Sequence, residues 1–166
     1  GVSSAASDVY KRQDLMALQS INFSAGSGGA VNSTTPSIWP SKGVITSPYG
    51  TRVDPVTGAA SAFHEGVDIA DDYGTPIVAT AAGTVTFAGY TEGGYGNLVE
   101  IDHGNGFVTR YGHNSAVLVT PGMTVKQGQV IALMGSTGKS TGAHGHYEVR
   151  INGSAVDPMV FLPISN

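Results

Sequence analysis

The 166-residue chain contains no cysteine and few charged residues. Without cysteine it can form neither disulfides nor thiolate metal sites, so a transition metal would have to be bound by His, Asp and Glu. Charged residues make up 12% of the chain, the formal net charge is -4, and the scattered Lys and Arg form no basic stripe. The composition therefore gives no electrostatic basis for binding nucleic acid or an anionic membrane surface.

Long apolar runs are also absent. None approaches the roughly 20 residues needed to span a bilayer, so we expect no membrane span in this chain. No intact signal peptide is visible, and the first residue is Gly1 rather than Met. These features predict a truncated or processed chain.

Glycine, by contrast, is abundant. The 24 glycines, together with a hydrophobic content of 40%, predict a real core built from short strands and tight turns. The fold class is therefore mainly β, with an antiparallel β-sheet or sandwich. The candidate strands lie in VITSPYG, GVDIA, PIVATAAGTVTFAGY, NLVEIDHG, FVTRYGH, QVIALMG and HGHYEVRI.

Two parts of the chain differ in composition. Residues 1–38 predict a short helical stub, over Asp8 to Ile21, followed by a flexible linker rich in Gly, Ser and Thr over Ser24 to Ser37. Residues 39–166 hold the candidate strands and are predicted to form one folded domain, which begins near Trp39.

The segment FHEGVDIADD begins like the HExxH motif of helical zinc proteases, but Asp68 stands where the second histidine would be. Gly66 and the following Val-Asp-Ile favour a strand over a helix. On a strand, His64 and Asp68 would share one face and Glu65 would point away from them. This placement disfavours Glu65 as the general base and makes it a bystander.

The segment HGHYEVRI places two histidines at strand spacing. His144, His146, Glu148 and Arg150 would share one strand face, opposite Tyr147 and its neighbours. Alone, the two histidines could be merely solvated, and the HxxxD pattern could be accidental. Together they supply two imidazoles and a carboxylate, which matches a catalytic zinc with three protein ligands and an open water position.

His103, in the turn DHGNG, belongs to neither pattern. A single histidine near a turn is more often a hydrogen-bonding surface residue than a ligand, so we leave it out of the candidate ligand set.

These residues resemble a known family. FHEGVDIA and GAHGHYEVRINGSAVDP, with SPYGTRVDPVTG, GTPIVATAAGTV, GYGNLVEIDHGNGFVTRYGH and GMTVKQGQVIALMGSTGKSTG, closely resemble the LytM/lysostaphin-type zinc metallopeptidases of bacterial cell-wall metabolism. The resemblance covers roughly residues 39 to 162. It implies a Zn²⁺ cofactor held by His64, Asp68 and His146, with His113 and His144 as the two further histidines of the site. It also implies a barrel sandwich related to the duplicated hybrid motif.

The activity that the resemblance implies is zinc-dependent hydrolysis of the peptide cross-links of peptidoglycan. The SPYGTRVDPVTG segment favours cleavage at D-alanyl cross-links over glycine bridges. The location implied is the bacterial cell envelope, periplasmic or extracellular, with peptidoglycan stem peptides and cross-bridges as partners. A regulatory envelope protein is a further expected partner.

Roles within the site are only partly assigned by sequence. His144 is the preferred general base because it lies next to His146, and His113 is the other candidate. Some relatives stabilise the transition state with a tyrosine. Tyr49, Tyr95 and Tyr111 are candidate donors here, although ordinary packing is the favoured alternative for them.

Two other functions compete with the peptidase. Some family members have lost catalytic residues and activate other cell-wall hydrolases, whereas all five site positions are present here. A phosphocarrier of the sugar phosphotransferase type would also use paired histidines in a glycine-punctuated β fold, but it needs neither the HxxxD carboxylate nor zinc.

Overall fold

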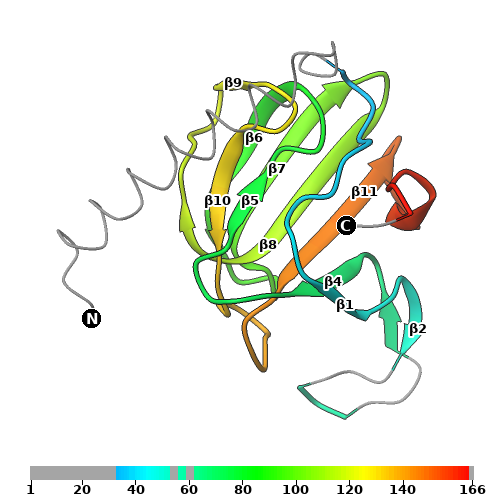
Figure 1. Ribbon diagram of the computed structural model, residues 1–166, viewed down its shortest axis with the longest axis vertical. Coiled ribbons are helices and arrows are strands. Elements are labelled where there is room, and N and C mark those ends of the chain that lie inside the picture. Colours follow the sequence, from blue (N-terminus) through cyan, green and yellow to red (C-terminus); the bar gives the residue numbers. More distant parts are fainter. Residues whose placement is uncertain (1–32, 53–55, 59–61, 165–166) are drawn as a thin grey trace, which may run out of the picture.

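The computed structural model describes residues 33–52, 56–58 and 62–164 (Figure 1). This part of the chain forms twelve strands and a single-turn 3-10 helix. The elements are β1 (Val44–Ser47), β2 (Gly50–Arg52), β3 (Ala62–His64), β4 (Val67–Ala70), β5 (Pro76–Val78), β6 (Gly83–Thr91), β7 (Gly96–Gly104), β8 (Phe107–Val117), β9 (Thr124–Val125), β10 (Val130–Met134), β11 (Gly145–Ile151), β12 (Ser154–Val156) and η3 (Pro158–Val160). The predicted helix over Asp8 to Ile21 lies outside the described residues.

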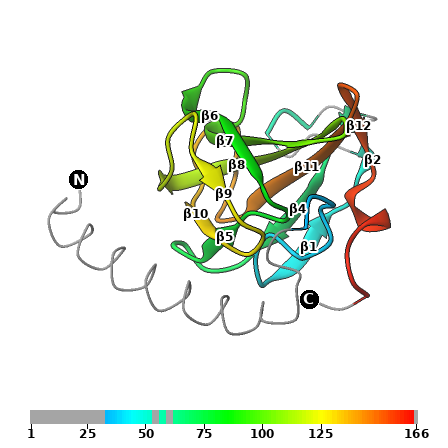
Figure 2. The ribbon, with the colours of Figure 1, turned by 90° about the horizontal axis from the view of Figure 1, so that it is seen from above.

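Ten of the strands form one sheet with the order β1-β4-β11-β8-β7-β6-β9. Strand β10 pairs with β8 and β5, and β12 pairs with β11, while β2 and β3 form a separate two-stranded sheet. Every pairing is antiparallel, which confirms the predicted class. In Figure 2, β5, β9 and β10 lie at one side of the molecule, and β2 and β12 lie at the other.

Side-chain alternation on the central strands builds the core. Tyr111 of β8 and Tyr147 of β11 are direct cross-strand partners, both 2% exposed, with ring centroids 5.5 Å apart. Their hydroxyls lie 3.1 and 2.8 Å from Oγ1 of the buried Thr80. Buried hydroxyls therefore have hydrogen-bond partners, as a close-packed interior requires. The opposite face of β8 and β11 is left for the polar site.

The predicted strand segments all contain a strand, and one of them contains two. The run from Pro76 to Tyr90 divides into β5 and β6, because residues 79–82 leave the sheet between them. Strands β2, β3, β9 and β12 were not predicted; each is two or three residues long, too short to show a periodic pattern.

Residues before Trp39 already contact the folded body. The backbone of Ser33 accepts a hydrogen bond from Ala82 at 2.6 Å, and Ser37 donates to Thr80 at 3.2 Å. Trp39 itself packs against the core. The domain boundary between residues 38 and 39 stays a prediction. No helix in the described part of the chain is long and apolar enough to cross a bilayer.

Candidate metal and catalytic site

The site is centred on the pairing of β4 with β11. Asp68 and His146 are direct partners in this register, so their side chains project from adjacent strands on the same face. Gly66 allows this close pairing, because a Cβ atom there would lie 2.3 Å from the carbonyl oxygen of Tyr147. The glycine of the HExxH-like segment is thus required by packing.

His64 enters the site from a different strand. It ends β3, the chain bends at Glu65 and Gly66, and Asp68 then lies in β4. The prediction that His64 and Asp68 share one continuous strand is therefore wrong. The bend nevertheless brings the two side chains together, with His64 Nε2 3.1 Å from Asp68 Oδ1.

Three potential donor atoms converge here. His64 Nε2 lies 3.1 Å from His146 Nδ1, and His146 Nδ1 lies 3.0 Å from Asp68 Oδ1. His64, Asp68 and His146 are the set of metal-ligating side chains that the described structure brings within 4.8 Å of one another. All three residues are buried, at 4%, 5% and 9% exposure.

In each of the two imidazoles, one ring nitrogen faces Asp68 and the other, the outer nitrogen, faces away. The hydrogen bond of the outer nitrogen determines whether the inner one carries a proton or a lone pair. His64 Nδ1 lies 2.9 Å from the carbonyl of Pro48, and His146 Nε2 lies 2.7 Å from Glu148 Oε2. A neutral imidazole that donates through one nitrogen presents a lone pair at the other. When both imidazoles are neutral, these tautomers direct three lone pairs, from the two inner nitrogens and the Asp68 oxygen, toward one another. Either a shared proton, which makes the contacts hydrogen bonds, or a metal cation relieves the repulsion.

This donor set fits zinc. Ligand atoms about 2.0–2.1 Å from a tetrahedral Zn²⁺ lie roughly 3.3 Å apart, and two imidazoles with one carboxylate form a known catalytic ligand set. The observed separations of 3.0–3.1 Å need little adjustment to reach this value. The assignment of His64, Asp68 and His146 as ligands stays a prediction that this geometry supports.

The electrostatics of the site favour positive charge. Burial acts to raise the pKa of Asp68, but hydrogen bonds to His146 and His64 outweigh it and hold that pKa well below its usual value. Burial acts to lower the pKa of His146, yet hydrogen bonds to Asp68 and Glu148 raise it to about 9. The carboxylates therefore stabilise positive charge at this position, whether it is a proton or a metal cation.

His113 reaches the site through an irregularity of β8. Asn97 pairs with Asn114 and Val99 pairs with Tyr111, so β7 advances by two positions while β8 advances by three, and β8 contains one extra residue. His113 also has a φ of 65°, which is uncommon for a residue with a side chain. Strict alternation would place His113 on the core face with Tyr111, and the bulge redirects it toward the candidate ligands.

His113 and His144 flank the same space. Their ring centroids lie 4.6 Å apart, and His113 lies 5.9 Å from the His146 ring. His113 Nδ1 donates to the carbonyl of Thr137 at 2.7 Å, and His144 Nδ1 lies 2.9 Å from the carbonyl of Gly142. In both residues Nε2 is therefore the basic nitrogen.

The surroundings of the two histidines differ. Burial, reinforced by the nearby His144, lowers the pKa of His113 to about 4. His144 is less enclosed, and its Nε2 lies 3.8 Å from Asp68 Oδ1. His144 is thus placed beside the candidate ligands, as predicted, and His113 lies across the same space. Their catalytic roles remain predictions.

None of the three candidate tyrosines presents an uncommitted hydroxyl. Tyr49 donates to the carbonyl of Ala155 at 3.2 Å, and Tyr95 donates to Glu148 Oε2 at 2.7 Å. Tyr111 lies in the core. These contacts agree with the packing alternative.

Glu65 and His103, which were not assigned to the candidate site, both have hydrogen-bond or ion-pair partners. Glu65 lies 2.8 Å from Arg150 and its side chain is 51% exposed, and its role as a bystander stays a prediction. His103 is 4% exposed and bonds to the carbonyl of Ala82 and to Thr109, so its predicted surface position is wrong. The polar turn sequence gave no sign that a core hydroxyl would bind its ring.

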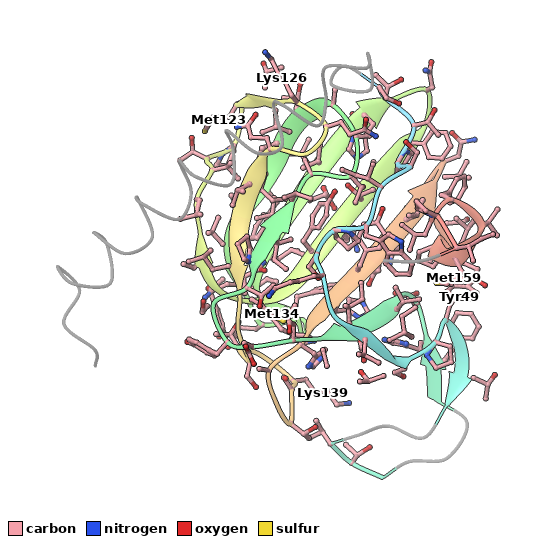
Figure 3. The ribbon with its side chains drawn as sticks, viewed as in Figure 1. Tyr49, Met123, Lys126, Met134, Lys139 and Met159 are labelled. Carbon is pink, nitrogen blue, oxygen red and sulfur yellow. The ribbon has the colours of Figure 1, made fainter. Side chains whose placement is uncertain are left out.

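A groove passes over the site. It has a volume of about 270 Å³ and is lined by three of the site histidines, His64, His113 and His146, together with Phe63, Glu65, Gly93, Gly94, Tyr95, Lys139 and Glu148. A second hollow of about 460 Å³ shares Gly93, Gly94 and Lys139 with it and extends over the turn between β6 and β7. Figure 3 shows Lys139 on the loop that joins β10 to β11.

Comparison with known sequences finds one family. Residues 62–158 match the model of peptidase family M23. The DD-carboxypeptidase/endopeptidase Mpg of Neisseria meningitidis is 49% identical over 120 residues, which cover 72% of this chain and 27% of that protein. The murein hydrolase activator NlpD of Escherichia coli is 40% identical over 125 residues, which cover 75% of this chain and 31% of NlpD. The chain thus spans about a quarter to a third of the length of these relatives.

Solved structures agree with the sequence matches. A zinc-containing peptidase from Vibrio cholerae superposes with a TM-score of 0.68 at 36% sequence identity, over 78% of this chain and 40% of that one. Sequence and fold therefore lead to the same group of proteins.

Proposed function

The chain belongs to peptidase family M23, and on this premise we propose that it is a zinc-dependent endopeptidase that hydrolyses peptide cross-links of bacterial peptidoglycan. The observation that supports this most strongly is the convergence of three potential ligand atoms, from His64, Asp68 and His146, within 3.0–3.1 Å of one another. Zn²⁺ is the proposed cofactor, and residues 39–166 are the proposed catalytic domain.

The metal would supply Lewis acidity, which activates water and polarises a peptide carbonyl. Two neutral imidazoles and one carboxylate leave a net positive charge on such a centre. The chain itself must then place the substrate, accept the proton of the nucleophile and deliver a proton to the leaving amine.

His144 is the proposed general base. Its Nε2 lies 3.8 Å from Asp68 Oδ1, while Nδ1 is held by the carbonyl of Gly142 at 2.9 Å. A proton accepted at Nε2 can pass to the leaving amine on the same side of the scissile bond. His113 Nε2 faces this space from β8, and we assign it the second proton-handling position. The hydrogen bond from His113 Nδ1 to the carbonyl of Thr137, at 2.7 Å, keeps the ring oriented.

The groove suits an extended peptide. It runs past His113 and the two candidate histidine ligands and adjoins the second hollow, so residues on either side of the scissile bond could be accommodated. The loops that form its wall are packed tightly, since a Cβ at Gly138 would lie 2.3 Å from the backbone nitrogen of Gly96. Such a wall positions a substrate without large rearrangement.

The D-alanyl cross-link is the proposed target. The Neisseria relative, 49% identical in this region, is described as a DD-carboxypeptidase/endopeptidase. Similarity to the murein hydrolase activator NlpD supports a location in the bacterial cell envelope. Because the chain covers only 27% of that relative, the activity of the whole protein forms part of the proposal.

A second candidate function is activation of another cell-wall hydrolase. The 40% identity to the murein hydrolase activator NlpD favours it. The five site residues argue for catalysis instead, because an activator needs no convergent set of potential metal ligands with two flanking histidines. An activator would need a partner hydrolase, which would be the regulatory envelope protein expected from the sequence.

The test compares wild type with His64→Ala and His113→Ala. Zinc content and release of soluble muropeptides from purified sacculi are measured for each. We expect the wild type to bind one zinc and cut, His64→Ala to lose zinc and activity, and His113→Ala to keep zinc but lose activity. A wild-type protein that binds no zinc and leaves sacculi intact would overturn the peptidase proposal. Zinc binding without cleavage would favour the activator.

A further inference from the structure

Glu148 is the most enclosed charged group beside the site, with 1% exposure. Both of its carboxylate oxygens are occupied by donors. Oε2 lies 2.7 Å from His146 Nε2 and 2.7 Å from the Tyr95 hydroxyl. Oε1 lies 2.9 Å from Nε and 2.9 Å from the terminal nitrogen of Arg150.

The arginines explain how this carboxylate stays ionised in the interior. Arg150 binds Oε1 through two nitrogens, and Arg110 approaches it at 3.9 Å. Arg110 is itself paired with Glu100 at 2.7 Å, and Arg150 with Glu65 at 2.8 Å. A buried charge is tolerated when it is paired and its lone pairs are satisfied. The network therefore holds Glu148 as an acceptor at a fixed place.

The two histidines of the metal site use opposite nitrogens. His64 directs Nε2 toward Asp68 and gives Nδ1 to the Pro48 carbonyl, whereas His146 directs Nδ1 inward and gives Nε2 to Glu148. In the other tautomer, His146 would point an N–H at the metal position and a lone pair at a carboxylate. Glu148 disfavours that tautomer because two acceptors would then face each other.

We propose that Glu148 is a positioning residue for the metal site: it fixes the tautomer and the ring orientation of His146, so that Nδ1 is available as a ligand. This proposal rests on the metal site of the proposed function, but not on peptide cleavage. A carboxylate behind a histidine ligand also strengthens the histidine as a donor. The Tyr95 hydroxyl donates to the same Oε2 of Glu148, and the Tyr95 ring lies 5.7 Å from that of His146. Tyr95 therefore helps to hold both Glu148 and His146 in place.

The variant Glu148→Gln tests this inference. All the groups close to the two oxygens are donors, so an amide nitrogen at either position would place N–H against N–H. Competition with a chromophoric chelator measures the zinc dissociation constant, and we expect it to rise by roughly 10–100-fold. Glu100→Gln is the matched control: it removes a carboxylate from the same arginine network without touching His146, so its zinc affinity should remain within about threefold of wild type.

A second measurement reports the tautomer directly. Nitrogen-15 NMR of the imidazoles in the zinc-loaded wild type should show the proton of His146 on Nε2 and that of His64 on Nδ1. This measurement keeps the inference testable if Glu148→Gln does not fold, which circular dichroism would reveal. A His146 proton on Nδ1, unchanged zinc affinity in folded Glu148→Gln, or an equal loss in Glu100→Gln would overturn the inference. A wild type that binds zinc through this tautomer but cuts no peptidoglycan would contradict the proposed function and leave the inference about Glu148 intact.

Discussion

Replacing Gly66 by alanine should damage the site while leaving its ligands in the sequence. The added Cβ would lie 2.3 Å from the carbonyl oxygen of Tyr147 and 2.9 Å from Cγ of Glu148. Both neighbours belong to β11, and the oxygen is backbone, which cannot rotate away. Strand β4 must therefore move away from β11 at the point where Asp68 faces His146.

The size of the movement follows from the contact. An ordinary carbon–oxygen contact is about 3.4 Å, so a contact of 2.3 Å requires a displacement of roughly 1 Å. A displacement of about 1 Å at a catalytic constellation can reduce its rate by about 100-fold. Overpacking should also lower the free energy of unfolding by about 1–3 kcal/mol. We expect Gly66→Ala to lose about two orders of magnitude in muropeptide release and to bind zinc more weakly.

Gly145→Ala is the matched control. Gly145 lies opposite Ile69 in the same strand pair, but a Cβ there would make only ordinary contacts, 3.6 Å to Ile77 and 3.7 Å to Met134. Zinc affinity and the rate of muropeptide release are measured for both variants at a temperature where both are folded. Activity of Gly66→Ala within threefold of Gly145→Ala would show that the site does not need Gly66 to keep β4 close to β11.

Further predictions concern the histidines and Glu65. His144→Ala should reduce muropeptide release by roughly 10²–10⁴-fold at unchanged zinc content; loss of zinc as well would make His144 a ligand. Glu65→Gln should keep most of the activity, because its ion pair is exposed and worth little; near-complete loss would restore Glu65 as the base. Burial lowers the pKa of His103 below 6.5, so the unfolded chain binds more protons. The stability due to His103 is complete above pH 6.5 and declines as the pH falls toward the folded pKa. Urea unfolding at pH 7 and pH 5 should therefore show a smaller acid loss in His103→Gln than in wild type; equal losses would contradict this.

Much of the fold could be predicted from the sequence because the long strands have clear turn residues and alternating patterns. On β11, the alternation correctly placed His146 and Glu148 on one face, where they contact each other, and Tyr147 on the other, where it packs against Tyr111. The close approach of His146 to Asp68 could not come from alternation, because it depends on which strands pair across 78 residues. The family resemblance, rather than periodicity, brought them together.

Local irregularities of the strands could not be predicted from the sequence patterns. The bend at Gly66 divides the HxxxD segment between two strands, and the bulge in β8 moves His113 from the core face to the site. Both depend on tertiary packing. The role of Glu148 was also missed, although strand alternation had already placed it on the same face as His146. A glutamate two residues from a candidate histidine ligand, on the same strand face, is the signal in the sequence that could have identified it.

We propose that a metal held by His64, Asp68 and His146 enables peptide hydrolysis. The most direct measurement is mass spectrometry of the muropeptides that the chain releases from purified sacculi, first after removal of metal by a chelator and then after addition of one equivalent of Zn²⁺. We expect no release from the stripped protein and, after zinc is restored, products whose D-alanyl cross-links are opened. The same products from the stripped protein, or none after zinc is restored, would contradict it.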